Sequence, residues 1–152
     1  MRNNPENPAG YSNDVYHGLI VTLLVIVGLL VSVSGCGKGE HRPVDLYPED
    51  MCGFCRMAVS DHRCAAEIIT LSGEVLKFDD ISCMENYRAM NTTVEVAAVF
   101  VKNYENREWL PLSGAIVAET DIATPMGSGK IAFADSARAR AFLREHSPQG
   151  LH

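Results

Sequence analysis

The sequence predicts an α+β domain made of two small strand–strand–helix units packed together. Strand-length runs of apolar and β-branched residues recur between positions 65 and 134, and helical segments begin at Ile81 and Ser136. Residues 77–80 (KFDD) and 132–135 (AFAD) lead into these helical segments, and each carries a phenylalanine and ends on aspartate. This short internal repeat indicates two copies of one unit.

The first unit begins with a predicted hairpin. Two strand-like runs, 65–71 (AAEIITL) and 74–78 (EVLKF), are separated by a Ser-Gly turn. Asp79 or Asp80 can then cap a helix over 81–90, because a carboxylate at this position accepts hydrogen bonds from free backbone amides.

The rest of the domain continues the alternation of strands and helix. Strands are expected over 94–104, 109–112, 115–119 and 131–134, with a glycine-rich loop over 124–130 before the last of them. Asp135 can cap a second helix, which begins at Ser136 and ends at about residue 145, before Pro148.

An apolar run near the amino terminus ends in Val-Ser-Gly-Cys36. The run covers 19–33, which is short for a bilayer-spanning helix of about 20 residues but fits the apolar core of a secretory signal. Small residues followed by cysteine resemble the lipobox of bacterial lipoproteins, in which the cysteine is acylated and becomes the first mature residue. We therefore predict a signal peptide over 1–35, a lipidated N-terminus and linker over 36–49, and one folded domain over 50–148.

A plain membrane anchor with an incidental cysteine stays open as an alternative. The residues before the apolar run include Arg2 but also Glu6 and Asp14, so the usual excess of positive charge is missing. Either interpretation exports the domain and tethers it to a membrane, with the domain on the periplasmic face. In a Gram-negative cell, Gly37 after the lipidated Cys36 indicates the outer membrane.

The charge of the chain argues against nucleic acid as a partner. The sequence has 13 Lys and Arg against 19 Asp and Glu, a net charge of −6 at pH 7, and it contains no basic run. Proteins that bind nucleic acid concentrate Lys and Arg on one surface. An acidic exported domain is better suited to a cation or a small ligand.

Cys52 and Cys55 form a C-x-x-C pair, and Met57 follows two residues later. This spacing lets two thiols reach one ion from a single turn. Thiolate and thioether ligands select Cu(I) over hard cations, and zinc gains little from methionine. The loop therefore predicts a Cu(I) site, with Cys55 and Met57 as its first ligands.

Met126 is the ligand expected from the second half of the domain. Pro125 before it and glycines after it predict an exposed loop, although a plug between the two halves is an alternative role. Cys52 and Cys83 complete the candidate set. Cys83 lies on the first predicted helix in one stripe with Met90, so core packing is its alternative role.

Other interpretations of the same cysteines stay open. An exported thiol–disulfide oxidoreductase would also use Cys52 and Cys55, although no helical pattern follows them to lower the pKa of the first thiol. A structural zinc site or disulfides would use the cysteines of the mature domain, which are Cys52, Cys55, Cys64 and Cys83. Cys64 abuts the first predicted strand and is expected to be structural.

The order of these motifs resembles the NosL family, the accessory lipoproteins of nitrous oxide reductase. The resemblance is carried by 50–57 (DMCGFCRM), 78–84 (FDDISCM), Trp109 and 124–127 (TPMG), and it spans about residues 50–146. It implies a fold of two similar α+β units. It also implies that 50–148 is a NosL-like metal-binding domain behind the lipoprotein signal.

The resemblance further implies a membrane-tethered periplasmic copper chaperone, not an enzyme. Such a protein binds Cu(I) and delivers it to a copper-requiring client, here nitrous oxide reductase during denitrification. Family members commonly carry Cys-Gly-Met where this chain has Cys55-Arg56-Met57, so Arg56 departs from the pattern and adds a positive charge beside the site. No catalytic residue is predicted, because the chain offers neither a Ser/His/Asp set nor a nucleotide-binding glycine loop.

Overall fold

The computed structural model describes residues 17–20, 23 and 40–147. Met1–Glu40 and His41–His152 are two separate units of the chain, and only the second contains strands in the part described. Cys36 and most of the predicted signal peptide (1–35) lie outside the described residues, so processing and lipidation stay predictions. Within the described ranges, no helix combines the length and apolarity that crossing a bilayer requires.

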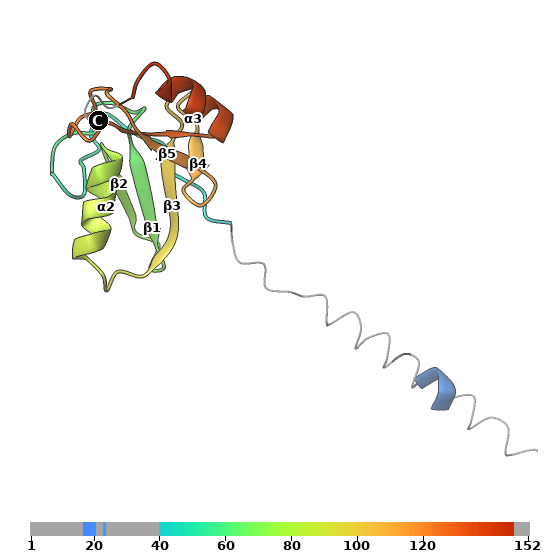
Figure 1. The fold of residues 1–152 in the computed structure, drawn as a ribbon. Helices are drawn as coiled ribbons and strands as arrows, with labels where there is room; N and C mark the ends of the chain where they lie inside the picture. Colours follow the sequence, from blue (N-terminus) through green and yellow to red (C-terminus); the bar gives the residue numbers. More distant parts are fainter. Residues whose placement is uncertain (1–16, 21–22, 24–39, 148–152) are drawn as a thin grey trace, which may run out of the picture. The chain divides into compact units, whose positions relative to one another are not determined.

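The first half of the second unit is a four-stranded antiparallel sheet with a helix along one side (Figure 1). Its strands are β1 (Ala66–Thr70), β2 (Val75–Phe78), β3 (Val96–Lys102) and β4 (Trp109–Pro111), in the order β2-β1-β3-β4. All five residues of β1 are buried, because β1 pairs with β2 on one edge and with β3 on the other. Such a strand needs apolar residues on both faces, and its sequence AEIIT meets this need except at Glu67.

Helix α2 (Ile81–Met90) begins at the predicted residue because Asp80 caps it. The Asp80 carboxylate accepts a hydrogen bond from Ser82 N at 2.8 Å, which satisfies one of the free amides of the first turn. Ile81, Cys83 and Met84 are buried against the sheet, in one core with Phe78 and Val101. Met90, predicted on the same stripe as Cys83, is instead 75% exposed.

The second half is a smaller copy of the same pattern. Strands β5 (Ile116–Glu119) and β6 (Lys130–Phe133) form a two-stranded antiparallel sheet, and helix α3 (Ser136–Leu143) follows. Asp135 caps α3 by accepting hydrogen bonds from the backbone amides of Ala137 and Arg138, both at 2.9 Å. A second core lies between this sheet and α3, and its buried members are Cys64, Ala118, Ile131, Phe133 and Ala139.

Each half is therefore a hairpin, a capping aspartate and a helix, and the predicted α+β class of two strand–strand–helix units is confirmed. The halves are unequal in size, because β3 and β4 join the first hairpin and extend it to four strands. Several polar contacts connect the halves. The Asp80 carboxylate also accepts hydrogen bonds from Met126 N at 3.1 Å and Ser128 Oγ at 2.7 Å. Near the end of β3, Asn103 pairs with Ala132 of β6 in a parallel bridge.

Part of the predicted linker contacts the sheet. The backbone amide of Val44 donates a hydrogen bond to Glu67 Oε1 at 3.0 Å, and Lys77 Nζ on β2 forms an ion pair with Asp50 at 2.6 Å. These contacts fix the chain to the sheet from about residue 44 onward, on the face that carries Glu67 and Lys77.

We expect Glu67→Gln to stabilise the protein at neutral pH. Burial raises the pKa of Glu67, in spite of the hydrogen bond from Val44 and the nearby Lys77 and Lys102. An acid whose pKa is raised by folding contributes stability below the pKa of the unfolded chain, ordinarily 4.5, and loses it as the pH rises through the folded value. Glutamine keeps an oxygen for Val44 N, so the free energy of unfolding should rise at pH 7 by on the order of 1 kcal/mol.

Denaturant unfolding of the full chain checks this expectation. The gain from Glu67→Gln should be present at pH 7 and should vanish near pH 3.5, where the carboxyl is protonated in both states. A variant that is less stable than the wild type at pH 7 would show that the ionised carboxylate stabilises the fold.

Candidate metal centre

A short loop before β1 holds the cysteine pair. Met51 and Ala58 form an antiparallel bridge at its ends. Inside the loop, Cys52 N donates to Met57 O at 2.7 Å, and Arg56 N donates to Cys52 O at 3.1 Å. These hydrogen bonds close the loop into a compact turn, so that Cys52 and Cys55 lie on a defined backbone.

The loop packs directly on the end of β2. Gly53 N donates to Lys77 O at 2.7 Å. A Cβ atom at Gly53 would lie 3.3 Å from Phe78 Cε1, so a larger residue would push the loop away from the sheet or displace the buried phenylalanine. This close approach brings the cysteine loop to the junction between β2 and α2.

The junction supplies two more polar side chains. Asp80 is used as the cap of α2, and Asp79, the residue before it, is 1% exposed. Cys55 Sγ donates to Asp79 Oδ1 at 3.5 Å, which is within range for a sulfur donor. Cys83 lies in the first turn of α2 and is also 1% exposed.

Four ligand atoms thus converge. The sulfur atoms of Cys52, Cys55 and Cys83 and a carboxylate oxygen of Asp79 all lie within 4.8 Å of one another. Ligand atoms bound to one ion at about 2.3 Å are separated by roughly 3.7–4.6 Å, so these four atoms need only small movements to share an ion. We refer to these four residues as the thiol–carboxylate cluster.

The cluster has one accessible member. Cys52, Cys83 and Asp79 are almost completely buried, whereas Cys55 is half-buried. A metal ion or a partner's ligand can therefore reach the cluster from the Cys55 side.

The thiols of Cys55 and Cys83 are held in the protonated form. Burial raises the pKa of Cys55, and the neighbouring Cys52 and Asp79 raise it further. Burial also raises the pKa of Cys83, with Cys52 as the second cause. A metal ion that binds these sulfurs must displace protons. The raised pKa values also make Cys55 and Cys83 weak nucleophiles at neutral pH.

The alternative uses of the cysteines gain little support from this arrangement. A thioredoxin-like pair needs a helix directly after the first cysteine, but the next regular element here is strand β1. Cys52, Cys55, Cys64 and Cys83 all carry free thiols. Cys64 belongs to the second core instead of the cluster, and burial raises its pKa to about 12. A zinc site made of all four cysteines is therefore not assembled.

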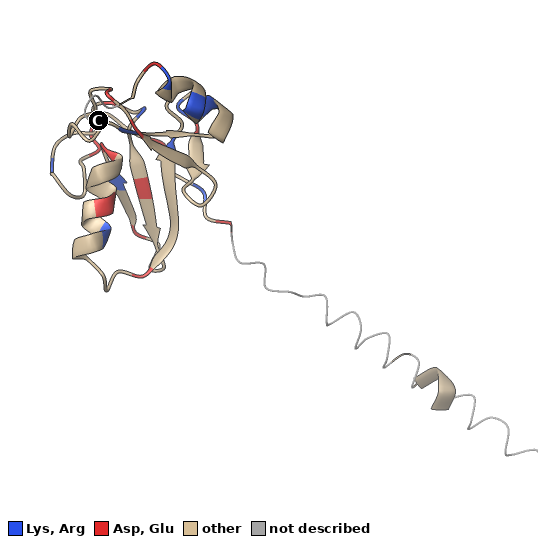
Figure 2. Ribbon diagram, viewed as in Figure 1, with Lys and Arg blue, Asp and Glu red and all other residues tan. Residues whose placement is uncertain are grey.

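The basic residues are distributed over several elements in the part of the chain that the structure describes (Figure 2). Figure 2 shows Lys and Arg spread over several elements, interspersed with Asp and Glu. Several of these side chains form ion pairs with neighbouring carboxylates. Examples are Arg63 with Asp61, Lys77 with Asp50 and Lys130 with Glu85.

The chain matches a known protein family. The NosL family model aligns with residues 43–151. The chain belongs to the NosL family. Its fold is similar to the crystal structure of the copper chaperone NosL from Shewanella denitrificans, with a TM-score of 0.59 and 15% sequence identity, over 69% of this chain and 87% of that chain. No curated protein sequence matches the chain.

The cysteine loop contains a strained residue. Arg56 has a φ of 64°, in the left-handed region that glycine adopts most easily. The turn therefore places an arginine in a conformation that is unfavourable for a residue with a Cβ.

The two methionines proposed as ligands lie at the surface. Met57 is 49% exposed and Met126 is 42% exposed. The backbone amide of Met126 is bound to Asp80, so the loop of the second half is held beside the start of α2. The exposure of Met126 argues against the alternative role as a plug between the halves. Thioethers at both positions are available to an ion or to a partner.

Asp79 is the member of the cluster that the sequence analysis did not propose as a ligand. The Asp79-Asp80 doublet was interpreted as a source of one helix cap, and Asp80 takes that role. The pair of adjacent aspartates could have indicated a second role for Asp79. One aspartate is enough to cap the helix, and a second carboxylate that is buried needs a partner of its own. The structure therefore brings Cys52, Cys55 and Cys83 together with a carboxylate, and leaves Met57 and Met126 at the surface.

We expect Arg56→Gly to stabilise the domain by about 1 kcal/mol, because it removes the left-handed strain of a residue that carries a Cβ. Arg56→Ala is the matched control: it removes the same charge but keeps the Cβ, so its free energy of unfolding should stay within about 0.5 kcal/mol of the wild type. Thermal or denaturant unfolding of the full chain measures both variants. Equal effects of glycine and alanine would mean that the side chain, not the backbone, governs stability at this position.

Proposed function

We propose that this NosL protein binds one Cu(I) ion at the thiol–carboxylate cluster and passes it to a copper-requiring client. The observation that carries the proposal is the convergence of three sulfur atoms and one carboxylate oxygen within 4.8 Å. Thiolates are soft ligands, and soft ligands favour Cu(I) over hard cations.

The charge of Cu(I) limits how many thiols ionise. A monovalent ion with three thiolates and a carboxylate would leave several negative charges in a buried site, which is costly. Two thiolates reduce the net charge of the ion and its sulfur ligands to −1. The third thiol can keep its proton, because the Asp79 carboxylate lies within 4.8 Å of each sulfur and can act as an acceptor. In this arrangement the Asp79 carboxylate accepts a hydrogen bond instead of binding the ion. The Cu(I) ion therefore keeps a low coordination number.

Zn(II) is the competing metal, because Asp79 is a specific observation in its favour. Three thiolates and a carboxylate can form the closed tetrahedral site that zinc prefers. Two arguments support copper instead: the membership of the NosL family, and the similarity of fold to a protein described as a copper chaperone. The exposed thioethers of Met57 and Met126 are further ligands for Cu(I) that zinc would not use.

Transfer of the ion is proposed to begin at Cys55. It is the half-buried cysteine of the cluster, and Met57 follows it on the exposed side of the same turn. A ligand of the client can therefore replace Cys55 first, while Cys52 and Cys83 still hold the ion from the buried side. Met126, on the loop tied to Asp80, is a candidate for a transient ligand during this exchange.

The sequence and the family membership support a proposal for the cellular setting. The chain is proposed to be an exported lipoprotein, acylated at Cys36 and tethered to the membrane on its periplasmic face, in the outer membrane if the cell is Gram-negative. Nitrous oxide reductase is the proposed client, because NosL proteins are its accessory lipoproteins. The chain is proposed to have no catalytic activity of its own. Its runner-up function, an exported thiol–disulfide oxidoreductase, predicts reduction of insulin by metal-free protein.

The lipid anchor is tested by mass spectrometry of the mature protein from a bacterial membrane. We expect the mature chain to begin at an acylated Cys36, and Cys36→Ser to prevent processing. A mature chain that begins elsewhere, or an unmodified Cys36, would remove the anchor from the proposal without affecting the metal site.

The metal site is tested by anaerobic competition with a chromogenic Cu(I) chelator, on the full chain in detergent. We expect binding of about one equivalent, and Cys55→Ser and Cys83→Ser should each weaken it by at least about tenfold, because each removes a soft ligand. Cys64→Ser is the matched control, since Cys64 is as buried as Cys83 but lies in the other core. Equal Cu(I) affinity in the Cys55, Cys83 and Cys64 variants would refute the cluster as the site.

Three further variants separate the metals and the ligands. Asp79→Asn should weaken Zn(II) binding more than Cu(I) binding, because a carboxylate oxygen is a ligand for zinc but a poor one for Cu(I). Met57→Leu and Met126→Leu keep the volume and remove the sulfur. They should slow transfer to an acceptor more than they lower equilibrium affinity.

A further inference from the structure

The first part of β3 is an open strand edge. β4 pairs only with residues 100–102, and the last hydrogen bond across this edge runs from Leu112 N to Val99 O at 2.9 Å. On the N-terminal side of Val99, β3 pairs with β1 along one edge. Along its other edge, no strand pairs with it in the described ranges. Ala97 has no partner in β4, and it has none in β1 because the register between β1 and β3 shifts between Ile69 and Thr70.

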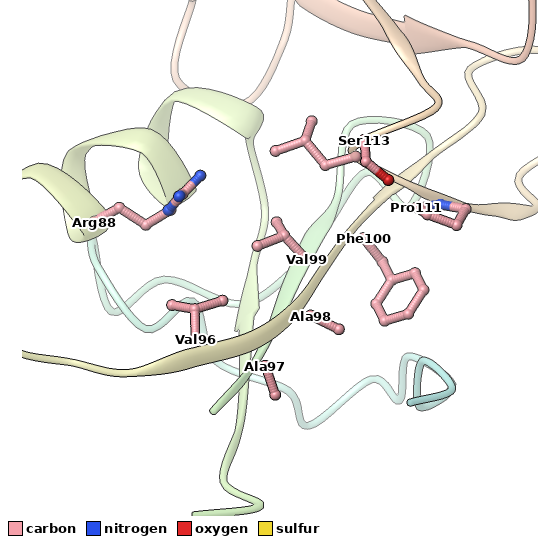
Figure 3. A pocket seen from close by; sticks show the side chains of 9 residues that line it. Arg88, Val96, Ala97, Ala98, Val99, Phe100, Pro111 and Ser113 are labelled. Carbon is pink, nitrogen blue, oxygen red and sulfur yellow. The ribbon is translucent and has the colours of Figure 1, made fainter. Parts of the chain in front are cut away.

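Apolar residues are partly exposed along this edge. Residues 96–99 (VAAV) are all half-buried, in contrast to the fully buried β1. A cavity of about 450 Å³ lies against them, as Figure 3 shows. It is closed at one end by Pro111, Leu112 and Ser113, where β4 ends.

A second cavity, of about 310 Å³, adjoins the first. It lies between the carboxyl end of α2 and the sheet, and it is also lined by Arg88 and Val96. Ile68 and Tyr87 form part of its floor. The two cavities together form a groove that follows the start of β3, which we call the β3-edge groove.

Arg88 is the charged residue that lines both cavities. It lies in the last turn of α2, and Figure 3 shows its side chain extending from the helix over the groove toward Val99. The ion pairs formed within the described part of the chain do not include it. A guanidinium over an apolar groove is matched by a carboxylate, with which it forms two parallel hydrogen bonds.

We infer that the β3-edge groove binds an extended acidic peptide segment of a partner protein. The segment adds as a strand beside residues 96–98, which satisfies the free backbone groups of that edge. Its small or β-branched side chains fill the two cavities, and an Asp or Glu side chain, or a terminal carboxylate, binds Arg88. The inference goes beyond metal binding and does not depend on it.

The charge at the groove disfavours a second copy of this chain as the occupant. Antiparallel pairing of two β3 edges requires a twofold axis perpendicular to the sheet, which puts both α2 helices on the same face. The two Arg88 side chains would then approach each other across the axis, and like charges placed together are destabilising. A partner segment with a carboxylate meets no such repulsion.

The groove and the thiol–carboxylate cluster lie at opposite ends of α2. Cys83 is in the first turn of the helix and Arg88 in the last. A partner held at the groove therefore leaves Cys55 uncovered.

The test is a selection of random octapeptides on the full chain in detergent, followed by binding measurements with one selected peptide. We expect enrichment of peptides that combine β-branched residues with Asp or Glu. Arg88→Gln should lower the affinity of a selected peptide by roughly tenfold, and replacement of the peptide's acidic residue by its amide should have the same effect. Arg140→Gln, in the last turn of α3, is the matched control and should leave the affinity unchanged.

Amide hydrogen exchange locates the bound peptide. Exchange at residues 96–98 should slow when the peptide binds. Selection of no acidic peptides, equal effects of Arg88→Gln and Arg140→Gln, or protection elsewhere in the chain would overturn the inference. A dimer that protects residues 96–98 without peptide would also overturn it, because the groove would then serve a second copy of the chain.

Discussion

The hydrogen-bonded, buried carboxylate of Asp80 is the interaction on which the geometry of the thiol–carboxylate cluster depends. It is completely buried and accepts hydrogen bonds from Ser82 N and Oγ on one side, and from Met126 N and Ser128 Oγ on the other. Burial raises the pKa of Asp80, but the hydrogen bonds outweigh burial and hold the pKa below its ordinary value. The group is therefore ionised at neutral pH. One carboxylate both starts helix α2 and ties the loop of the second half to the first half, so the loss of this group would affect both sides of the site.

A fixed start of α2 determines where the buried ligands lie. Asp79 precedes the cap and Cys83 follows it in the first turn, and both meet a cysteine loop whose own hydrogen bonds hold Cys52 and Cys55 in place. The result is a cluster that is closed on the protein side and open at Cys55. This asymmetry suits a protein that must hold a soft ion away from water and still release it. A structural site would be closed on all sides, because it has no ion to exchange.

Local structure was predictable from the sequence, and so were the three cysteines that the fold brings together in the thiol–carboxylate cluster. Strands and helices followed from β-branched runs and from Asp80 and Asp135, because these signals act over a few residues. The pairing of β3 with β1, the open edge of β3 and the buried Glu67 depend on contacts between distant segments, and no local pattern encodes them. The same limit applies to the site. Spacing indicated Cys52 and Cys55, but the buried role of Asp79 emerges only when β2 and α2 are in place.

The most direct test of the account is copper K-edge X-ray absorption of the full chain loaded anaerobically with one equivalent of Cu(I). The account predicts a first shell of two or three sulfur atoms supplied mainly by the cluster. Cys64→Ser should leave that shell unchanged, whereas Cys83→Ser should reduce its sulfur count or replace a sulfur with a lighter ligand. A shell dominated by nitrogen or oxygen, or an identical shell in the wild type and in Cys83→Ser, would contradict the account.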